Sequence, residues 1–251
     1  MTATAGRTRL QPVYRRMHGV ALAGRNFGPS DYRRSGEMAA LLRAHDRLPA
    51  TAVIVDVGAN LGGWTLEASR LWPAAHIHAF EPSAVTYRQL TQVTAGLNVR
   101  CVRAAVSEKA GVAKLHSVPQ LSGLSSLHHR DLAEHGVDMT DNEEVSLVTL
   151  DDYCEQQSIA RIDFLKIDAE GHDLAVLLGA RELLNAGRID IVQFEFGGAN
   201  IDSRTYLRDF VRLLEPRYRI TRLLADGAED LRYSEREEVF VTSNFVAERL
   251  V

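Results

Sequence analysis

The chain has 251 residues, of which 45% are hydrophobic and 25% are charged, and it carries a net charge of −4 at pH 7. These values fit one large α/β domain with a full core and exclude a wholly disordered chain. No stretch approaches the roughly 20 apolar residues that span a bilayer. Cys101 and Cys154 are too few for a disulfide framework, so we expect a cytoplasmic protein.

The first 34 residues form a basic arm with seven arginines and a single acid, Asp31. The arm therefore has a charge of +6, which leaves −10 on the rest of the chain. It has no apolar segment of the kind that a secretory signal peptide needs, and we expect none. Two interpretations stay open: a solvated terminus, or a surface that binds an anionic partner, the acidic body of the same chain or a second subunit. The overall acidity argues against a nucleic-acid partner.

Apolar runs and helical patterns alternate along the rest of the chain, after a short helix expected over 36–47. We expect strands over 52–57, 76–80, 99–105, 162–167, 189–194, 218–224 and 238–242. Helices are expected over 61–72, 83–93, 174–184 and 205–214. Because strands that alternate with helices pair in parallel, this order predicts a doubly wound, Rossmann-like α/β sheet of about seven strands. The last two runs predict an antiparallel hairpin at the sheet edge.

The stretch over 107–150 interrupts this alternation with Ser, Gly and His clusters and one clear strand, over 144–150. A long irregular insertion in a compact domain is usually functional. We therefore divide the chain into an arm with a short helix over 1–50 and one domain over 51–251 that contains the insertion. The string L-S-G-L-S-S-L-H-H-R over 121–130 is typical of a mobile lid. Its adjacent histidines lack metal-site spacing, and we predict no metal.

A glycine-rich turn, D-V-G-A-N-L-G-G over 56–63, follows the first expected strand. Glycines there let the chain turn sharply, and the helix that follows exposes N–H groups suited to an anion. The spacing G-x-x-x-G-G is neither the dinucleotide fingerprint nor a P-loop. Asp56 can accept a hydrogen bond from an ammonium or a backbone N–H. The alternative is a tight turn without a ligand, but such turns lie at the usual ligand crevice of open sheets.

Glu81 ends the second expected strand, 23 positions after Gly58, and Pro82 follows it. An acid at this place can hold both hydroxyls of a ribose. Taken alone it also fits a helix cap or a solvated side chain. Together with the glycine-rich turn, it predicts a nucleoside-bearing cofactor.

The string L-K-I-D-A-E-G-H-D over 165–173 places several ionisable groups at the end of the fourth long strand. Asp168 is suited to orient an amine, and Glu170 or His172 to act as general base toward a hydroxyl. The alternative is a helix start whose acids counter the helix dipole, which explains His172 less well. We predict Asp168, Glu170 and His172 as catalytic residues and leave open which of them is the base.

The string F-E-F-G-G-A-N over 194–200 follows the next strand. It places Glu195 at the rim of the expected pocket, beside glycines that allow a ligand to approach closely. A plain loop is the alternative.

Together these motifs resemble the FkbM family of S-adenosylmethionine-dependent methyltransferases. The similarity covers about residues 53–242 and leaves 1–50 unassigned. It is carried by V-D-V-G-A-N-L-G-G-W-T (55–65), F-E-P (80–82), A-A-V-S (104–107), L-K-I-D-A-E-G-H-D (165–173) and F-E-F (194–196).

The resemblance implies a class I methyltransferase sheet, S-adenosylmethionine as cofactor, and methyl transfer to a hydroxyl of a sugar, polyketide or other secondary metabolite. It implies that Asp168 meets the methionine amine or the acceptor and that Glu81 holds the ribose. The full predicted cofactor set is Asp56, Gly58, Asn60, Gly62, Glu81, Pro82, Ala105, Val106 and Asp168. The residue at position 172 is often not His in the family, so a His172 base rests on this chain alone.

Alternative functions stay open. One is a non-catalytic protein that binds a nucleoside cofactor and acts through the basic arm. Another is an NAD-dependent dehydrogenase, against which the missing G-x-G-x-x-G counts. N-methylation is a chemical neighbour of the preferred reaction, since an amine needs less help from a base.

Overall fold

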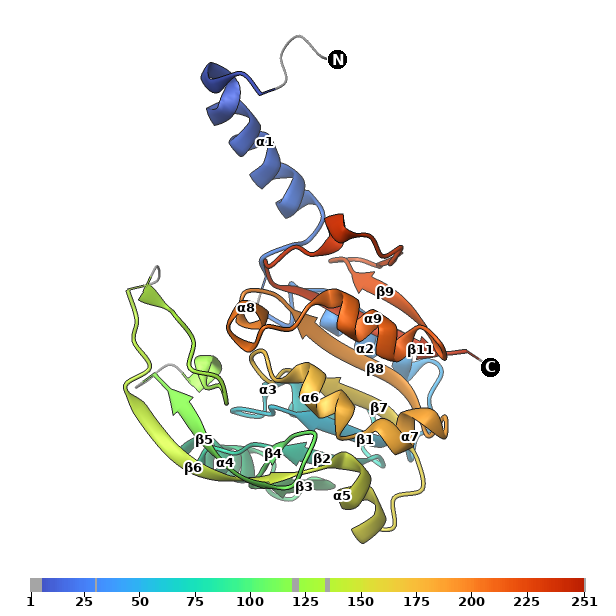
Figure 1. Ribbon diagram of the computed structural model, residues 1–251. Helices are drawn as coiled ribbons and strands as arrows, with labels where there is room; N and C mark the ends of the chain where they lie inside the picture. The colour runs from blue at the N-terminus through green and yellow to red at the C-terminus, as the bar shows by residue number, and fades with distance from the viewer. Residues whose placement is uncertain (1–5, 30, 119–121, 134–135, 251) are drawn as a thin grey trace.

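The computed structural model describes residues 6–29, 31–118, 122–133 and 136–250. Its N-terminal part consists of the short 3₁₀ helix η1 (Thr8–Leu10) and helix α1 (Gln11–Gly24), which projects from the body (Figure 1). Every residue of α1 is at least partly exposed. No helix was predicted over Gln11–Gly24, and the helix found there has no buried residue. Within the described ranges, no helix has the length and apolarity needed to cross a membrane.

One eight-stranded sheet forms the centre of the molecule, in the order β10-β9-β11-β8-β7-β1-β2-β3. Strands β3, β2, β1, β7 and β8 run parallel, and β11 is antiparallel to β8 and β9. The strands are β1 (Val53–Val57), β2 (His76–Phe80), β3 (Val99–Val102), β7 (Ile162–Ile167), β8 (Ile189–Phe196), β9 (Tyr218–Leu223), β10 (Ala228–Asp230) and β11 (Ser243–Arg249). The predicted fold class, a mostly parallel α/β sheet with antiparallel C-terminal strands, is confirmed.

The predicted strand over 238–242 is wrong. The last strand begins at Ser243, after the 3₁₀ helix η4 (Glu235–Glu237), and lies between β8 and β9 instead of at the edge. Two apolar runs lie close together there, around Val241 and around Phe245. Phe245 is 2% exposed and Val241 is 37% exposed, so burial selects the second run. The edge hairpin is instead formed by β9 and β10.

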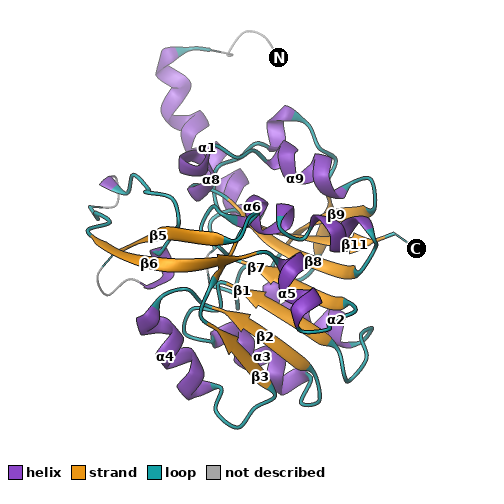
Figure 2. Cartoon of the chain, turned by 60° about the horizontal axis from the view of Figure 1, so that its bottom comes forward, coloured by secondary structure: helices purple, strands orange, loops and turns teal. Residues whose placement is uncertain are grey.

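Helices cover both faces of this sheet (Figures 1 and 2). Alternate residues of the buried strands point to opposite faces, as the two-residue period of a strand requires. On one face, Ile54 and Phe164 pack with helices α2 (Glu37–His45) and α3 (Gly63–Leu71). Helix α4 (Ala84–Val93) packs near them through Leu90.

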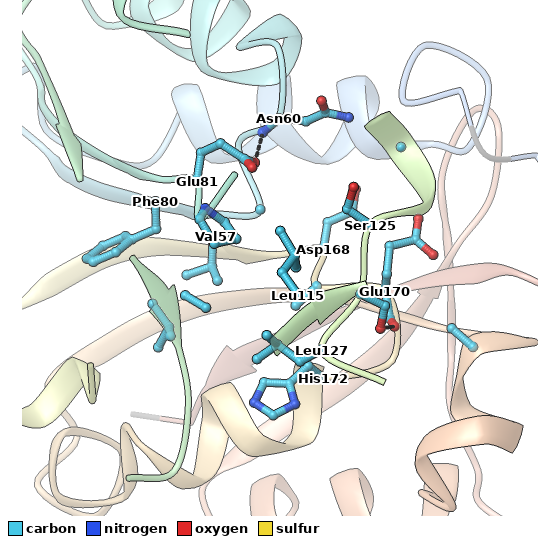
Figure 3. A pocket seen from close by; sticks show the side chains of 18 of the residues that line it. Val57, Asn60, Phe80, Glu81, Leu115, Ser125, Leu127, Asp168, Glu170 and His172 are labelled. Carbon is cyan, nitrogen blue, oxygen red and sulfur yellow. Dashed lines mark hydrogen bonds between the residues drawn. The ribbon is translucent and has the colours of Figure 1, made fainter. Parts of the chain in front are cut away.

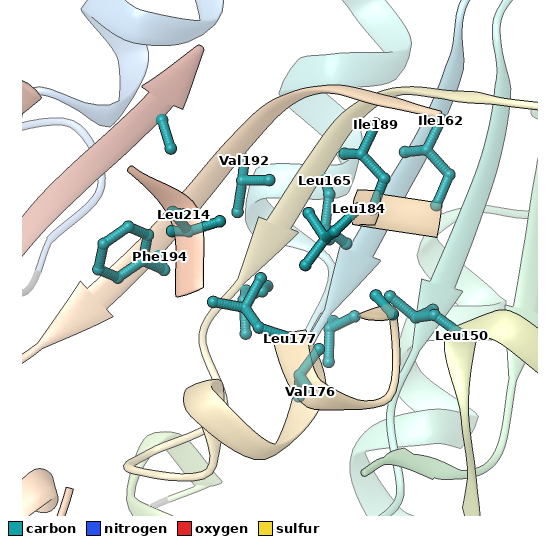
Figure 4. Close-up of a cluster of buried hydrophobic side chains, with 14 of the residues drawn as sticks. Leu150, Ile162, Leu165, Val176, Leu177, Leu184, Ile189, Val192, Phe194 and Leu214 are labelled. Atoms are coloured by element: carbon teal, nitrogen blue, oxygen red, sulfur yellow. The ribbon is translucent and has the colours of Figure 1, made fainter. Parts of the chain in front are cut away.

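The other face carries the larger core, which includes Leu165, Val192 and Phe194 (Figure 4). Phe194 stacks there against Phe210 and against Phe245. Its helices are α5 (Leu150–Gln156), α6 (Asp173–Leu178), α7 (Arg181–Asn185) and α9 (Leu207–Leu214). The single helix predicted over 174–184 is two, separated near Gly179. A Cβ on Gly179 would lie 2.0 Å from the carbonyl oxygen of Ser107, so the insertion approaches the helix backbone at this glycine.

The insertion and the two residues before it form a second sheet of three strands in the order β4-β6-β5, of which Figure 2 labels β5 and β6. These are β4 (Ala105–Val106), β5 (Gly111–Ser117) and β6 (Asp141–Val148). The run predicted as one strand over 99–105 is therefore divided between two sheets, and β5 was missed. The segment after β5, with the 3₁₀ helix η2 (Ser122–Leu124), returns toward the end of β7. Leu121, the first residue of the predicted lid, lies outside the described residues.

Candidate active site

A cavity of about 460 Å³ lies at the carboxyl ends of the parallel strands. In open α/β sheets this edge is where ligands bind, because the loops that follow the strands meet there. Figure 3 shows Glu81 and Asn60 at one end, His172 at the other, and Asp168 between them. The insertion closes one side with Leu115 and Leu127. The cavity therefore has two ends, which we name the Glu81 end and the His172 end.

Glu81, directly after β2, is held by three donors. Its Oε2 accepts from the backbone N–H of Asn60 at 2.9 Å. Its Oε1 accepts from the N–H of Ser83 at 3.0 Å and from the hydroxyl of Thr86 at 2.6 Å. Burial raises the pKa of Glu81, and these hydrogen bonds act in the opposite direction. The carboxyl is thus fixed in position at the cavity wall, as a group that recognises hydroxyls must be.

The glycine-rich turn is fixed in place by contacts within the protein. A Cβ on Gly58, which has a φ of +80°, would lie 1.9 Å from the carbonyl oxygen of Asp168. Gly62 lies outside the cavity lining, and its Cα faces Leu90 and Val93 of α4. The N–H groups of Gly58 and Ala59 donate to the carbonyl of Phe80. The N–H groups of Gly58, Ala59, Asn60 and Gly62 are therefore all engaged within the protein.

Asp56 also lies below the cavity, not in its lining. It is fully buried, and its Oδ2 accepts from the hydroxyl of Thr65 at 2.6 Å. Its Oδ1 lies 3.8 Å from Lys166 Nζ. These contacts connect β1 to α3 and to β7, and they do not reach the cavity.

Several observations at the Glu81 end fit the predicted cofactor. Asn60 lines the cavity, and its buried Oδ1 finds no hydrogen-bond partner among the described residues. A buried polar atom without a partner is costly, so a donor from a ligand would satisfy it. Pro82, Ala105 and Val106 form an apolar wall suited to a base ring. A fixed carboxylate, an amide acceptor and an apolar wall are the groups that an adenosine moiety needs.

At the end of β7, Asp168 faces the cavity beside a buried lysine. Lys166 Nζ donates to Asp168 Oδ2 at 3.2 Å, and 40% of the Asp168 side chain is exposed. Burial acts to lower the pKa of Lys166, but the charges of Asp168, Asp56 and Glu37 raise it above its usual value. Lys166 is therefore a permanent cation, which holds Asp168 from below.

Glu170 joins the lid segment to the β7–α6 loop. Its carboxylate forms an ion pair with Arg130, and its backbone carbonyl accepts from the hydroxyl of Ser126 at 2.7 Å. Its φ is +48°, in the left-handed region that non-glycine residues seldom adopt. Burial and the charge of Asp168 raise the pKa of Glu170 to about 8, although Arg130 acts against them.

His172 lies in a line of three polar side chains. Its Nε2 is 2.9 Å from the hydroxyl oxygen of Ser107, and its Nδ1 is 3.1 Å from Nε2 of His128. Burial, followed by the neighbouring His128, lowers the pKa of His172 to about 4. The ring is therefore neutral at pH 7, with both nitrogens engaged by the insertion.

Glu195 and Asp173 complete an acidic group at this end. Asp173 is 1% exposed, and its two oxygens accept from the N–H groups of Glu195 and Ala169, each at 3.3 Å. Burial and the charge of Asp168 raise the pKa of Asp173 to about 7. Glu195 lines the cavity, and within the described part of the chain its carboxylate has no hydrogen-bond donor.

The cavity brings together most of the residues that the sequence predicts. Gly58, Asn60, Glu81, Pro82, Ala105, Val106, Asp168, Glu170 and His172 all line it, whereas Asp56 and Gly62 do not. The site roles of these residues stay predictions. Leu115 and Thr242 also line the cavity and lie outside the motifs named from the sequence. They are apolar or small, and no pattern in the sequence distinguishes them from core residues. Among the described residues, no group of His, Cys, Asp and Glu side chains is arranged to hold a metal ion.

The strand order, the cavity at the carboxyl edge and the acid after β2 define a class I methyltransferase fold. A family model described as the methyltransferase FkbM domain matches residues 56–220. The chain belongs to this family of S-adenosylmethionine-dependent methyltransferases. The predicted family and the predicted cofactor are thereby confirmed.

Two relatives support the same assignment. The chain is 33% identical over 162 residues to methyltransferase sdnD of Sordaria araneosa, covering 54% of this chain and 62% of the relative. It is 34% identical over 155 residues to the 31-O-demethyl-FK506 methyltransferase FkbM of Streptomyces tacrolimicus, covering 52% and 60%. The chain thus spans about three fifths of the length of these relatives.

Solved structures with a similar fold share little sequence. The METTL16 methyltransferase domain is 11% identical, with a TM-score of 0.49 over 89% of this chain and 70% of that one. A TehB-like S-adenosylmethionine-dependent methyltransferase from Corynebacterium glutamicum is 14% identical, with a TM-score of 0.45 over 96% and 98%.

Proposed function

We propose that this chain transfers the methyl group of S-adenosylmethionine to a hydroxyl oxygen of a small molecule, such as a sugar, a polyketide or another secondary metabolite. Membership of the FkbM family supports methyl transfer. The observation that carries the proposal is one cavity with Glu81 at one end, Glu170 and His172 at the other, and Asp168 between them. A relative that acts on 31-O-demethyl-FK506 supports a hydroxylated acceptor. A cytoplasmic location fits the free thiols of Cys101 and Cys154.

Each end of the cavity has a proposed role. Glu81, with Asn60 beside it, binds the ribose hydroxyls, and Ala105 and Val106 border the base. Asp168, held by Lys166, binds the methionine ammonium group. When bound, the cofactor supplies a methyl group on a positively charged sulfur, which is already activated for transfer.

The His172 end holds the acceptor in this proposal. Leu115 and Leu127 exclude water from it, and Glu170 and His172 keep the lid segment in place through Arg130 and His128. The acceptor oxygen must then line up with the methyl carbon and the sulfur, which is an effect of positioning. The hydroxyl must also lose its proton, because a neutral alcohol is a poor nucleophile. Asp168, Glu170 and His172 remain the catalytic residues proposed from the sequence.

Calorimetric titration of the full chain with S-adenosylmethionine, S-adenosylhomocysteine and NAD tests the cofactor site. We expect micromolar binding of the two sulfur nucleosides and none of NAD. Incubation with S-adenosylmethionine and either methyl glucoside or 31-O-demethyl-FK506, followed by mass spectrometry, then tests transfer. A mass gain of one methyl group on an acceptor supports the proposal. Tight binding without transfer to any hydroxylated compound would favour the non-catalytic alternative, and NAD binding would favour the dehydrogenase.

A further inference from the structure

Glu195 occupies a distinctive place at the His172 end of the cavity. It is the second-last residue of β8, between β7 and β11, and it pairs with Asn244 across the sheet. Its side chain lines the cavity. Alternate residues of a strand share a face, so Glu195 lies on the same face of the sheet as Gln193. Gln193 in turn donates to Glu37 of α2 at 2.6 Å.

The other acids and bases of this end are already engaged. Asp168 is paired with Lys166, and Glu170 with Arg130. His172 has contacts at both ring nitrogens, with Ser107 and His128. Asp173, as described above, is buried below the cavity and accepts two backbone N–H groups. Within the described chain, Glu195 is thus the cavity-lining acid of this end whose oxygens have no donor.

We infer that Glu195 is the catalytic base that takes the proton of the acceptor hydroxyl, an assignment that rests on the proposed methyl transfer. The acceptor oxygen attacks the methyl carbon with a lone pair. The carbon–sulfur bond breaks, and its electron pair stays on sulfur. The O–H proton passes to a carboxylate oxygen of Glu195. The products are the methyl ether, the neutral thioether S-adenosylhomocysteine and a protonated Glu195, which then releases the proton to water.

The surroundings of Glu195 make its charge depend on what fills the cavity. Burial, followed by the charges of Asp168, Glu170, Asp173 and Glu37, raises the pKa of Glu195 well above its usual value. The nearby cations, Lys166 and Arg130, are each paired with another acid, and Asn244 is uncharged. Burial and the acidic charges therefore favour the protonated form of Glu195 in the free protein. A positive sulfur placed in the cavity lowers its pKa, so that the base forms when the methyl donor is present.

Proton release on binding tests this inference without any acceptor. The full chain is titrated at pH 7 with S-adenosylmethionine and with S-adenosylhomocysteine, in two buffers of different ionisation enthalpy. The difference between the buffers gives the protons released, by linkage. We expect S-adenosylmethionine to release more protons than the uncharged thioether does. Protons carried by the ligands themselves are the same for every variant, so comparison between variants cancels them.

Two variants make the assignment specific. Glu195→Gln should abolish the extra release while still binding S-adenosylhomocysteine. Glu143→Gln is the matched control and should keep the extra release, because Glu143 lies outside the cavity lining. Equal release from Glu195→Gln and the wild type overturns the assignment, as does loss of the release in Glu143→Gln. Should Glu195→Gln not fold, Glu195→Asp keeps a carboxyl and must retain the extra release. If neither sulfur nucleoside binds the wild type, the proposed function itself fails.

Discussion

The Glu81 end and the His172 end of the cavity are both acidic, but they use their acids differently. At the Glu81 end one carboxyl is held by three donors, beside an apolar wall. At the His172 end four acids, Asp168, Glu170, Asp173 and Glu195, share two cations, Lys166 and Arg130. A fixed carboxyl suits recognition of a constant ligand. A group of acids with too few cations suits chemistry in which a proton is gained and lost.

The largest effect should come from Gly58, where the backbones of the two ends touch. In Gly58→Ala the new Cβ would lie 1.9 Å from the carbonyl oxygen of Asp168, and φ is +80°. We expect the free energy of unfolding to fall by at least about 3 kcal/mol, from left-handed strain and a backbone clash. Gly96→Ala is the control, because its φ is +81° and a Cβ there meets nothing within 4 Å. For that variant, urea unfolding should show a loss of about 1–2 kcal/mol in the free energy of unfolding. Equal losses for the two variants would mean that the contact at Asp168 costs nothing.

Removal of the Glu81 carboxyl should weaken the binding of S-adenosylmethionine at the Glu81 end. We expect Glu81→Ala to lower the affinity for S-adenosylmethionine by about 100-fold or more, since charged hydrogen bonds to ribose are lost. Glu143→Ala is a matched control: Glu143 accepts from the N–H of Ala84 at the start of α4, but it lies outside the cavity lining. Calorimetry should show nearly wild-type affinity for the control. Normal binding by Glu81→Ala would show that Glu81 does not hold the ribose.

The sequence predicts the Glu81 end well because its residues follow strands that pair side by side. Gly58 and Glu81 come directly after two parallel strands, so their places meet at one edge without knowledge of the loops. Gly62 shows where this logic stops. It looks like a ligand-binding glycine, but its missing Cβ makes room for Leu90 and Val93. A glycine that lets a ligand approach and a glycine that makes room for a side chain cannot be distinguished from the sequence alone.

The His172 end is less predictable because its contacts join distant segments. Arg130 and Glu170 are 40 positions apart, and His128 and His172 are 44 apart. No period in the sequence indicates that the insertion returns to the end of β7. The strand β5, which begins that return, has one buried residue among its seven and was missed. The charged side chain of Lys166, within an apolar run, also gives no sign that it is buried beneath Asp168.

A pH dependence of stability should distinguish the His172 end. The pKa of His172 is lowered to about 4 in the folded protein, so between pH 6.5 and 4 the unfolded chain binds more protons. The stabilisation from a neutral His172 is thus present above pH 6.5 and is lost as the pH falls through 4. Between pH 7 and pH 4.5, we expect the free energy of unfolding to fall by about 2 kcal/mol less in His172→Gln than in the wild type. Urea unfolding at the two pH values measures this difference. His18→Gln, in the exposed helix α1, should follow the wild type. Parallel curves for all three proteins would show that burial of His172 carries no such cost.

The smallest effect separates the position of the Glu81 carboxyl from its charge. Thr86 is buried, and its hydroxyl donates to Glu81 Oε1 at 2.6 Å. Thr86→Val keeps the shape and removes the donor, so the carboxyl is held by backbone groups alone. We expect the affinity for S-adenosylmethionine to fall about fivefold to tenfold, which corresponds to about 1 kcal/mol, the net contribution of one hydrogen bond. Thr94→Val makes the same change at the end of the same helix, where the hydroxyl donates to the carbonyl of Leu90. Affinity should be unchanged there. If Thr86→Val binds as tightly as Thr94→Val, the backbone donors of Asn60 and Ser83 suffice to position Glu81. The Glu81 end would then owe its rigidity to the turn and not to α4.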